Sequence, residues 1–315
     1  MTFSNSPVVH PEPVLAARPA ADESYPMACS LRWRQGKLWV SAMVSGRDVP
    51  LPALASEVWF QACLARSQAT AVCIDLDLGR VVIDLWAKAC EGAQKPLYLR
   101  IPGLPNPPKN QHPTAWRIKR LGDLVAAVLL LIGLSPLLLL LAALIKLENQ
   151  GPVFETQWRV GERGKLFRLY RFRSTVIDAD TRPLRDRYGA TEQSFEGRDV
   201  KVTVLGKWMR KRKIDHLPQL INVLRGEMSL VGPRPWSICA VVREPPALRA
   251  RFNILPGITG SMTMAGAASS NQQCVIPCND LAYISHWTLL KDVKILALMA
   301  PREVMGIGLA NVSRP

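Results

Sequence analysis

Residues 124–145 have the sequence LVAAVLLLIGLSPLLLLLAALI, which is 22 consecutive positions without a charged side chain. A run this long and apolar is typical of a segment that lies in a lipid bilayer, whereas a buried helix of a soluble domain keeps a polar edge. Ser135 and Pro136 divide the run into halves of eleven and nine residues. As helix, each half would be about 15 Å long, or about half of a hydrocarbon core.

Positive charge flanks this apolar run on both sides. Basic residues precede it at Arg117, Lys119 and Arg120, and others follow it at Lys146, Arg159, Arg163 and Lys165. Because such residues accumulate on the cytoplasmic side of membrane segments, both ends are expected there. Pro136 removes a backbone donor and favours a bend. We therefore predict a re-entrant membrane helical hairpin over residues 116–148 with its break at Ser135 and Pro136. A proline-kinked spanning helix is the alternative.

The first third of the chain has a different composition. Residues 1–28 are rich in Pro, Ala and Ser and lack the pattern of a signal peptide, so we predict a disordered leader. Residues 29–101 predict a separate small α/β domain of unknown role. Its expected elements are a hairpin that turns at Gln35 and Gly36, helices near 52–67 and 81–90, and strands at 71–78 and 96–101. Residues 102–115, which include PGLPNPPKNQHP, have the composition of a linker.

Composition restricts the class of partner. The 315 residues include 40 Lys and Arg against 25 Asp and Glu, and the net charge of +15 favours a polyanion. Nucleic acid would account for the charge but not for the apolar run, so we expect anionic lipid or a phosphorylated substrate and no nucleic acid. The seven cysteines form no regular array, which indicates reduced thiols facing a cytoplasm. Cys274 and Cys278 lack a second ligand pair, so we expect no metal site there.

Five fragments of the remaining chain occur in the order and spacing of a known family. They are KRLGDLVAAVLLLIGLSPLLLLLAALIKLENQGPVF from Lys119, QWRVGERGKLFRLYRFRST from Gln157, LGKWMRKRKIDHLPQLINVLRGEMSLVGPRP from Leu205, LPGITG from Leu255 and DLAYISHWTLLKDVKIL from Asp280. From about residue 119 to 296 the chain resembles the bacterial sugar transferases that are monotopic polyprenyl-phosphate phosphoglycosyl transferases of the exopolysaccharide-initiating type.

The resemblance implies both a fold and a reaction. It implies a small mixed α/β catalytic domain over residues 149–315, attached to the cytoplasmic face of the bacterial inner membrane by the re-entrant helix. The implied reaction moves a phosphosugar from a nucleotide diphosphate sugar to a polyprenyl phosphate, with Mg²⁺ as cofactor and a covalent aspartyl phosphosugar intermediate. The lipid bilayer is then a partner, and homo-oligomers or downstream glycosyltransferases are left open as further partners.

Asp215 is the candidate nucleophile. Leu217, Leu220 and Leu224 follow helical spacing, so a helix is expected to begin near Asp215 with Pro218 in its first turn. Asp before a helix is ordinarily a plain N-cap, stabilised by free backbone donors. The resemblance assigns it a catalytic role instead, because Asp215 aligns with the family's nucleophile.

Cations are the other requirement of phosphoryl transfer, which depends on neutralising charge. The candidates for binding substrate phosphate are Arg171, Arg173, Lys201, Arg210 and Arg234. Prolines on both sides of Arg234 present it on a stiff loop, and its guanidinium can bind two phosphate oxygens at once.

Two departures from the family pattern lie near this chemistry. The family normally has Glu after the nucleophile, where it helps to hold the metal, but this chain has His216, and Mg²⁺ prefers oxygen ligands. After PGITG, Thr263 and Ala267 replace the usual Gln and Arg. Either another carboxylate, Glu227 or Asp199, supplies the metal ligand, or the protein is a catalytically silent relative that binds lipid phosphate or a partner enzyme at the membrane.

Overall fold

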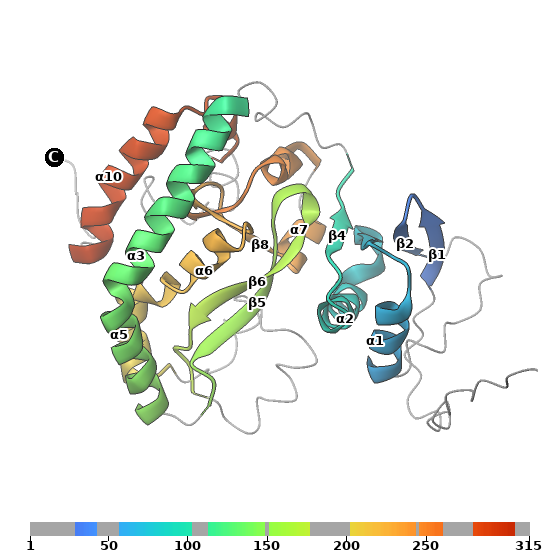
Figure 1. The fold of residues 1–315 in the computed structure, drawn as a ribbon, viewed down its shortest axis with the longest axis horizontal. Coiled ribbons are helices and arrows are strands. Elements are labelled where there is room, and N and C mark those ends of the chain that lie inside the picture. The colour runs from blue at the N-terminus through green and yellow to red at the C-terminus, as the bar shows by residue number, and fades with distance from the viewer. Residues whose placement is uncertain are drawn as a thin grey trace, which may run out of the picture.

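The computed structural model describes residues 29–42, 57–102, 113–148, 151–176, 202–243, 246–260 and 280–305. The predicted leader, residues 1–28, lies outside this part of the chain, as does most of the predicted linker. The fold is mixed α/β, as expected (Figure 1).

The N-terminal sheet has four strands in the order β1-β2-β3-β4. β1 and β2 form the expected antiparallel hairpin, and Gln35 and Gly36 at its turn both have positive φ, 53° and 72°. β2, β3 and β4 are parallel, because a helix connects each to the next. The elements are β1 (Cys29–Arg34), β2 (Lys37–Ala42), α1 (Glu57–Arg66), β3 (Ala71–Asp75), α2 (Gly79–Gly92) and β4 (Leu97–Arg100).

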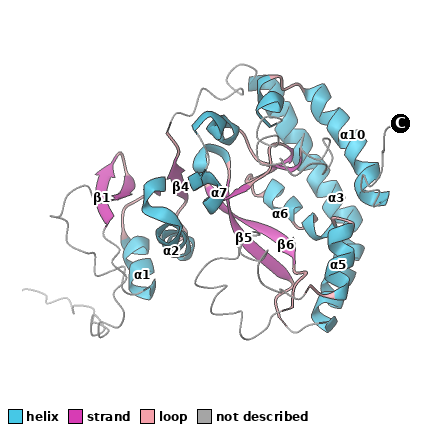
Figure 2. Cartoon of the chain, turned by 180° about the vertical axis from the view of Figure 1, so that it is seen from behind, coloured by secondary structure: helices cyan, strands magenta, loops and turns pink. Residues whose placement is uncertain are grey.

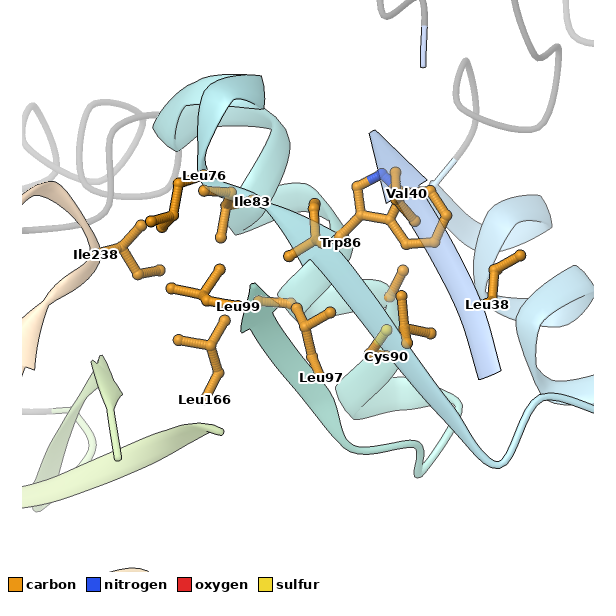
Figure 3. Close-up of a cluster of buried hydrophobic side chains, with 14 of the residues drawn as sticks. Leu38, Val40, Leu76, Ile83, Trp86, Cys90, Leu97, Leu99, Leu166 and Ile238 are labelled. Atoms are coloured by element: carbon orange, nitrogen blue, oxygen red, sulfur yellow. The ribbon is translucent and has the colours of Figure 1, made fainter. Parts of the chain in front are cut away.

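The separation of this N-terminal unit from the rest of the chain is not confirmed. Its core, built around the fully buried Trp86, continues without a break into Leu166 and Ile238 of the following unit (Figure 3). Arg168 also forms a bidentate pair with Glu91 of α2, with distances of 2.5 to 3.1 Å. Apolar surface is buried between the two units, so they pack as one body.

The apolar segment forms a single helix, α3 (Pro113–Glu148), which runs along one side of the body (Figure 1). It begins three residues before the predicted start. It is long and apolar enough to cross a membrane, and only 11% of its most apolar window is buried. That exposure distinguishes α3 from the core helix of a soluble protein. Its buried side chains recur at helical spacing on one stripe: Lys119, Asp123, Ala127, Leu141 and Ile145.

The predicted break of this helix is not seen. Residues 113–148 are helical throughout, so the two halves of α3 do not fold back on each other, and the re-entrant topology is not confirmed. Pro136 has no N–H and cannot donate to the Ile132 carbonyl four residues earlier. Ser135 Oγ donates to that same carbonyl over 2.7 Å. The serine hydroxyl therefore replaces the bond that the proline removes, and the helix continues.

The remaining elements form two small sheets covered by helices. β5 (Phe154–Val160) pairs antiparallel with β6 (Leu166–Phe172) and β8 (Trp236–Ser237), and β7 (Ser229–Val231) pairs parallel with β9 (Gly257–Thr259). The helices include α5 (Val204–Lys211), α6 (Gln219–Leu224), α7 (Ile238–Arg243) and α10 (Leu289–Met305), and 3-10 turns include η4 (Glu162–Gly164), η7 (Ile214–His216) and η8 (Pro246–Asn253). α6 lies between the β5–β6 ribbon and α3 (Figure 2).

Candidate active site

Asp215 lies in η7, a single 3-10 turn between α5 and α6. The chain enters this turn through Lys213, whose φ of 54° is left-handed, and Pro218 is the N-cap of α6. The expected single helix is therefore a 3-10 turn followed by a short α-helix. The Asp215 residue is only 6% exposed, so its carboxylate lies within the protein rather than on a solvated helix end.

His216 is oriented by Gln219, a contact that the sequence analysis missed. Gln219 Nε2 lies 2.7 Å from His216 Nδ1, and His216 Nε2 lies 3.7 Å from Asp215 Oδ2. An amide NH₂ can only donate, so with the Gln219 amide in this orientation Nδ1 accepts and the imidazole proton is on Nε2, toward Asp215. The three-residue spacing, one helical turn, was the signal that could have revealed the pair.

Three of the five predicted phosphate-binding cations lie around the end of β6. Arg171 is the second-last residue of the strand, and Arg173 follows the strand with only 3% of its surface exposed. Arg210, on α5, donates from Nε to the Ser174 hydroxyl over 2.7 Å and so ties α5 to this strand end. β6 and α5 both contact η7, the turn that carries Asp215. Lys201 lies outside the described residues.

Arg234 is exposed on the loop that follows β7. This loop packs backbone to backbone against the PGITG segment, because a Cβ on Gly257 or on Gly260 would overlap the main chain of Gly232. The Gly232 N–H donates to the Thr259 carbonyl over 3.0 Å. The sequence analysis missed this role for the glycines, which allow two loops that are distant in sequence to approach closely.

Glu227, a predicted metal ligand, follows α6 in the chain, whereas Asp215 precedes that helix. Its Oε2 accepts from Asn222 Nδ2 over 2.7 Å, and Asn222 is itself fully buried and bonded to the β6 backbone at Arg168 and Tyr170. Glu227 also lines a cavity of about 290 Å³ beside Tyr98 of β4. These contacts make it part of the packing between α6 and β6.

The side chains near Asp215 could coordinate a metal ion only if substrate supplied further oxygen ligands. Among the described residues, no three His, Cys, Asp or Glu side chains form a group that could hold a metal ion. The His216 Nδ1 is occupied by Gln219, which leaves the Asp215 carboxylate as the oxygen ligand that the turn offers. Mg²⁺ commonly takes one or two carboxylates and completes its coordination with phosphate and water oxygens. Asp199, the other predicted metal ligand, lies outside the described residues.

Comparison with known proteins matches residues 114–305 to the model of the bacterial sugar transferase family. The undecaprenyl-phosphate glucose phosphotransferase of Komagataeibacter xylinus is 40% identical over 199 residues, 59% of this chain and 36% of that protein. The UDP-N-acetylgalactosamine-undecaprenyl-phosphate N-acetylgalactosaminephosphotransferase of Aeromonas hydrophila is 40% identical over 196 residues, 61% of this chain and 44% of that protein. The exopolysaccharide production protein ExoY of Sinorhizobium fredii is 33% identical over 198 residues, 60% of this chain and 87% of that protein.

The family model covers only the part of the chain that follows the N-terminal sheet. The match spans less than half the length of the first two relatives but most of ExoY. The N-terminal sheet lies before the region of the family model, whereas α3, η7 and the glycine loops lie within it. The family model matches well over half of the chain, and the protein belongs to the bacterial sugar transferase family.

Proposed function

We propose that the protein is a membrane phosphoglycosyl transferase that moves a phosphosugar from a nucleotide diphosphate sugar to a polyprenyl phosphate. The observation that carries the proposal is the buried Asp215 carboxylate, held in a tight turn that contacts the arginine-bearing end of β6. Relatives are named for uridine diphosphate sugars and undecaprenyl phosphate, so these are the first substrates to test.

The reaction proceeds in two displacements. A carboxylate oxygen of Asp215 attacks the phosphorus that bears the sugar; the new P–O bond forms as the bond to the inner phosphate breaks, and a nucleoside monophosphate leaves. An oxygen of the lipid phosphate then attacks the same phosphorus, which releases Asp215 and forms the lipid diphosphate sugar. Arg171, Arg173 and Arg234 would neutralise the phosphate oxygens.

His216 occupies the position of the usual glutamate and would act on the nucleophile directly. Its Nε2–H faces Asp215 Oδ2 at 3.7 Å, so it would orient the carboxylate and stabilise its charge before attack. Mg²⁺ held by the Asp215 carboxylate and by substrate phosphate oxygens would supply neutralisation of the charge on the leaving phosphate.

The contacts of α3 support membrane attachment from one face. Lys119 near its start binds Asp292, and Glu148 at its end accepts from the backbone N–H groups of Val204 and Leu205 over 3.0 and 3.3 Å. These two anchors are about 43 Å apart along a helix, farther than the roughly 30 Å thickness of a hydrocarbon core. That both anchors bind the same folded domain supports placing both ends of α3 on one face of the membrane, and the basic flanks support a cytoplasmic face.

The test uses membranes that contain the full chain, supplied with a panel of uridine diphosphate sugars and undecaprenyl phosphate. We expect nucleoside monophosphate release in step with a lipid-linked sugar product. Without lipid acceptor, a covalent intermediate requires that labelled uridine monophosphate exchange into the sugar nucleotide.

Asp215→Asn is the matched control for this assay. It removes the charge but hardly changes the size, and Asn supports a turn about as well as Asp. We expect the variant to stay membrane-bound and to lose both release and exchange. Activity in a folded Asp215→Asn protein would eliminate covalent catalysis by this residue. Absence of release from the wild type with every sugar would favour the silent, lipid-phosphate-binding alternative.

A further inference from the structure

Lys119 is a buried cation that the proposed chemistry does not use. Its side chain is 6% exposed, and its ammonium contacts three elements. Nζ lies 2.7 Å from Asp292 Oδ2 on α10 and 3.7 Å from Asp123 Oδ2 on α3 itself. It also donates to the Val231 carbonyl, at the end of β7, over 3.1 Å. Each of the three N–H bonds of the ammonium therefore has an acceptor nearby.

The two carboxylates beside Lys119 are held by neutral donors. Ser229 Oγ donates to Asp123 Oδ2 over 2.6 Å, Tyr283 OH to Asp292 Oδ1 over 2.7 Å, and Trp287 Nε1 to Asp292 Oδ2 over 3.1 Å. Burial, with the charge of Asp292 as the second cause, raises the pKa of Tyr283 far above its ordinary value. Tyr283 therefore stays protonated and keeps its bond to Asp292.

Lys119 is the main hydrogen-bond donor to the Val231 carbonyl. The Ser229 and Tyr283 hydroxyls also lie within 2.9 and 3.4 Å of this oxygen. Each hydroxyl has one hydrogen, however, and a shorter bond to a carboxylate, which is the stronger acceptor. Val231 is the last residue of β7, so this carbonyl holds the strand where the loop that bears Arg234 begins. The loop is held further along by the Gly232 N–H, which donates to the Thr259 carbonyl, and by the Pro233 carbonyl, which accepts from the Gly257 N–H.

We propose that Lys119 is a positioning residue, which fixes the Val231 carbonyl and thereby sets where the Gly232–Pro235 loop presents Arg234 to substrate phosphate. The phosphate role of Arg234 rests on the proposed function. Lys119 belongs to the apolar helix α3, which lies beside α10 in Figure 1. The seating of that helix and the position of the phosphate-binding loop are therefore mechanically coupled.

Packing of α3 against α10 does not by itself require the charged ammonium of Lys119. Buried ion pairs can often be replaced by apolar side chains of similar volume without loss of stability. Here one lysine faces two aspartates, which leaves an excess negative charge in the interior. A directed donor to a backbone carbonyl, by contrast, is something that an apolar side chain cannot supply.

The experiment compares two variants of the full chain that differ only at Lys119. Asp292→Asn removes the closer of the two ion pairs but keeps the pair with Asp123 and the lysine bond to Val231. Adding Lys119→Met to Asp292→Asn removes that bond as well, and the double variant keeps the single excess negative charge of the wild-type cluster. This avoids the unfolding that two uncompensated aspartates would cause in Lys119→Met alone.

Hydrogen exchange gives a readout that does not depend on activity. We expect the amides of Gly232 and Gly257, which join the two glycine loops, to exchange about tenfold faster in the double variant than in Asp292→Asn. Equal exchange in the two variants would overturn the positioning role, even if the wild type transferred no sugar.

The kinetic arm asks whether Lys119 acts through Arg234. We expect the Lys119 change to raise KM for the sugar nucleotide about tenfold. In an Arg234→Gln background the same change should alter KM by less than about twofold, because the loop then no longer presents the guanidinium. The same fold-change in both backgrounds would show a merely structural effect and would contradict the proposal. A wild type without turnover would refute the proposed function and leave the exchange result to decide the positioning role.

Discussion

At the residue scale, His216 beside Asp215 is oriented by a neighbouring side chain. Gln219 is 2% exposed and bonds the imidazole Nδ1, which leaves Nε2 to face the Asp215 carboxylate. A glutamate in this position would carry a charge and offer oxygen to a metal, whereas an imidazole offers a hydrogen. At this position the imidazole therefore presents an N–H toward the Asp215 carboxylate, 3.7 Å away, where a glutamate would present oxygen.

Gln219→Leu tests that arrangement. Leucine fills a similar volume but cannot bond Nδ1, so the ring loses its preferred tautomer and orientation. We expect kcat to fall about tenfold with little change in KM, since in the proposed mechanism His216 acts on the nucleophile Asp215, and a bond that orients His216 matters most in the transition state. Steady-state release of nucleoside monophosphate measures both constants. A rise in KM alone would show that Gln219 contributes to ground-state binding instead.

At the element scale, α3 accommodates a proline without interruption. Ser135 supplies the hydrogen bond to the Ile132 carbonyl that Pro136 cannot make. In a bilayer no water replaces a missing donor, so the serine hydroxyl should matter more there than in a soluble helix.

A double-mutant cycle isolates this contact. Ser135→Ala should destabilise the membrane-embedded protein by about 1 kcal/mol, the scale of hydrogen bonds inside membranes. In a Pro136→Ala background the same change should have almost no effect, because the backbone N–H of the introduced alanine would bond the Ile132 carbonyl. Thermal unfolding of the four proteins in lipid nanodiscs measures the coupling. Equal losses in the two backgrounds would show that Ser135 acts elsewhere.

The topology of α3 can be measured by cysteine labelling. Arg117 and Leu147 are exposed and flank the apolar part of the helix, whereas Lys119 is buried and unsuitable. If both ends lie on the cytoplasmic face, Arg117→Cys and Leu147→Cys should each resist an impermeant maleimide in intact cells and react after permeabilisation.

Native cysteines supply the controls for this labelling. Cys63 is exposed in the N-terminal unit and should react only after permeabilisation. Burial raises the pKa of Cys29 to about 11 and of Cys90 to about 12. At pH 8 both thiols stay protonated and should remain unlabelled in the folded protein. Reaction of one introduced cysteine in intact cells would show that α3 spans the bilayer.

At the scale of the whole molecule, the N-terminal sheet is built into the sugar transferase unit. Gly164, with φ of 78°, lies so close to β4 that a Cβ there would overlap the Leu99 carbonyl oxygen. Leu166 and Ile238 complete the core under the sheet. Loss of the N-terminal unit would therefore expose apolar surface on the sugar transferase unit.

Gly164→Ala tests this union against Gly36→Ala. The two glycines both have positive φ, 78° and 72°, so both substitutions introduce backbone strain, about 1 kcal/mol. Around Gly36 the nearest atom to the added Cβ is the Thr70 hydroxyl oxygen at 3.8 Å, whereas at Gly164 the Leu99 backbone must move. We expect Gly164→Ala to cost at least about 2 kcal/mol more in urea unfolding. An equal fall in the free energy of unfolding for the two variants would mean that the two units separate easily.

Local pattern was enough to predict much of this protein from sequence. The apolar run predicts α3 within three residues of its start, and the Gln35–Gly36 turn predicts the first hairpin. Leucine spacing predicts a helix that begins near Asp215, where the structure has a 3-10 turn followed by α6. Each of these depends on side chains that are close in the chain, where periodicity and backbone preference act directly.

Tertiary structure decided the contacts between distant segments. The shared core under the N-terminal sheet joins Trp86 to Ile238, Lys119 reaches Val231 across more than a hundred residues, and Gly257 packs on Gly232. Such contacts depend on which surfaces meet when the chain packs, and a single sequence carries no periodic signal for them.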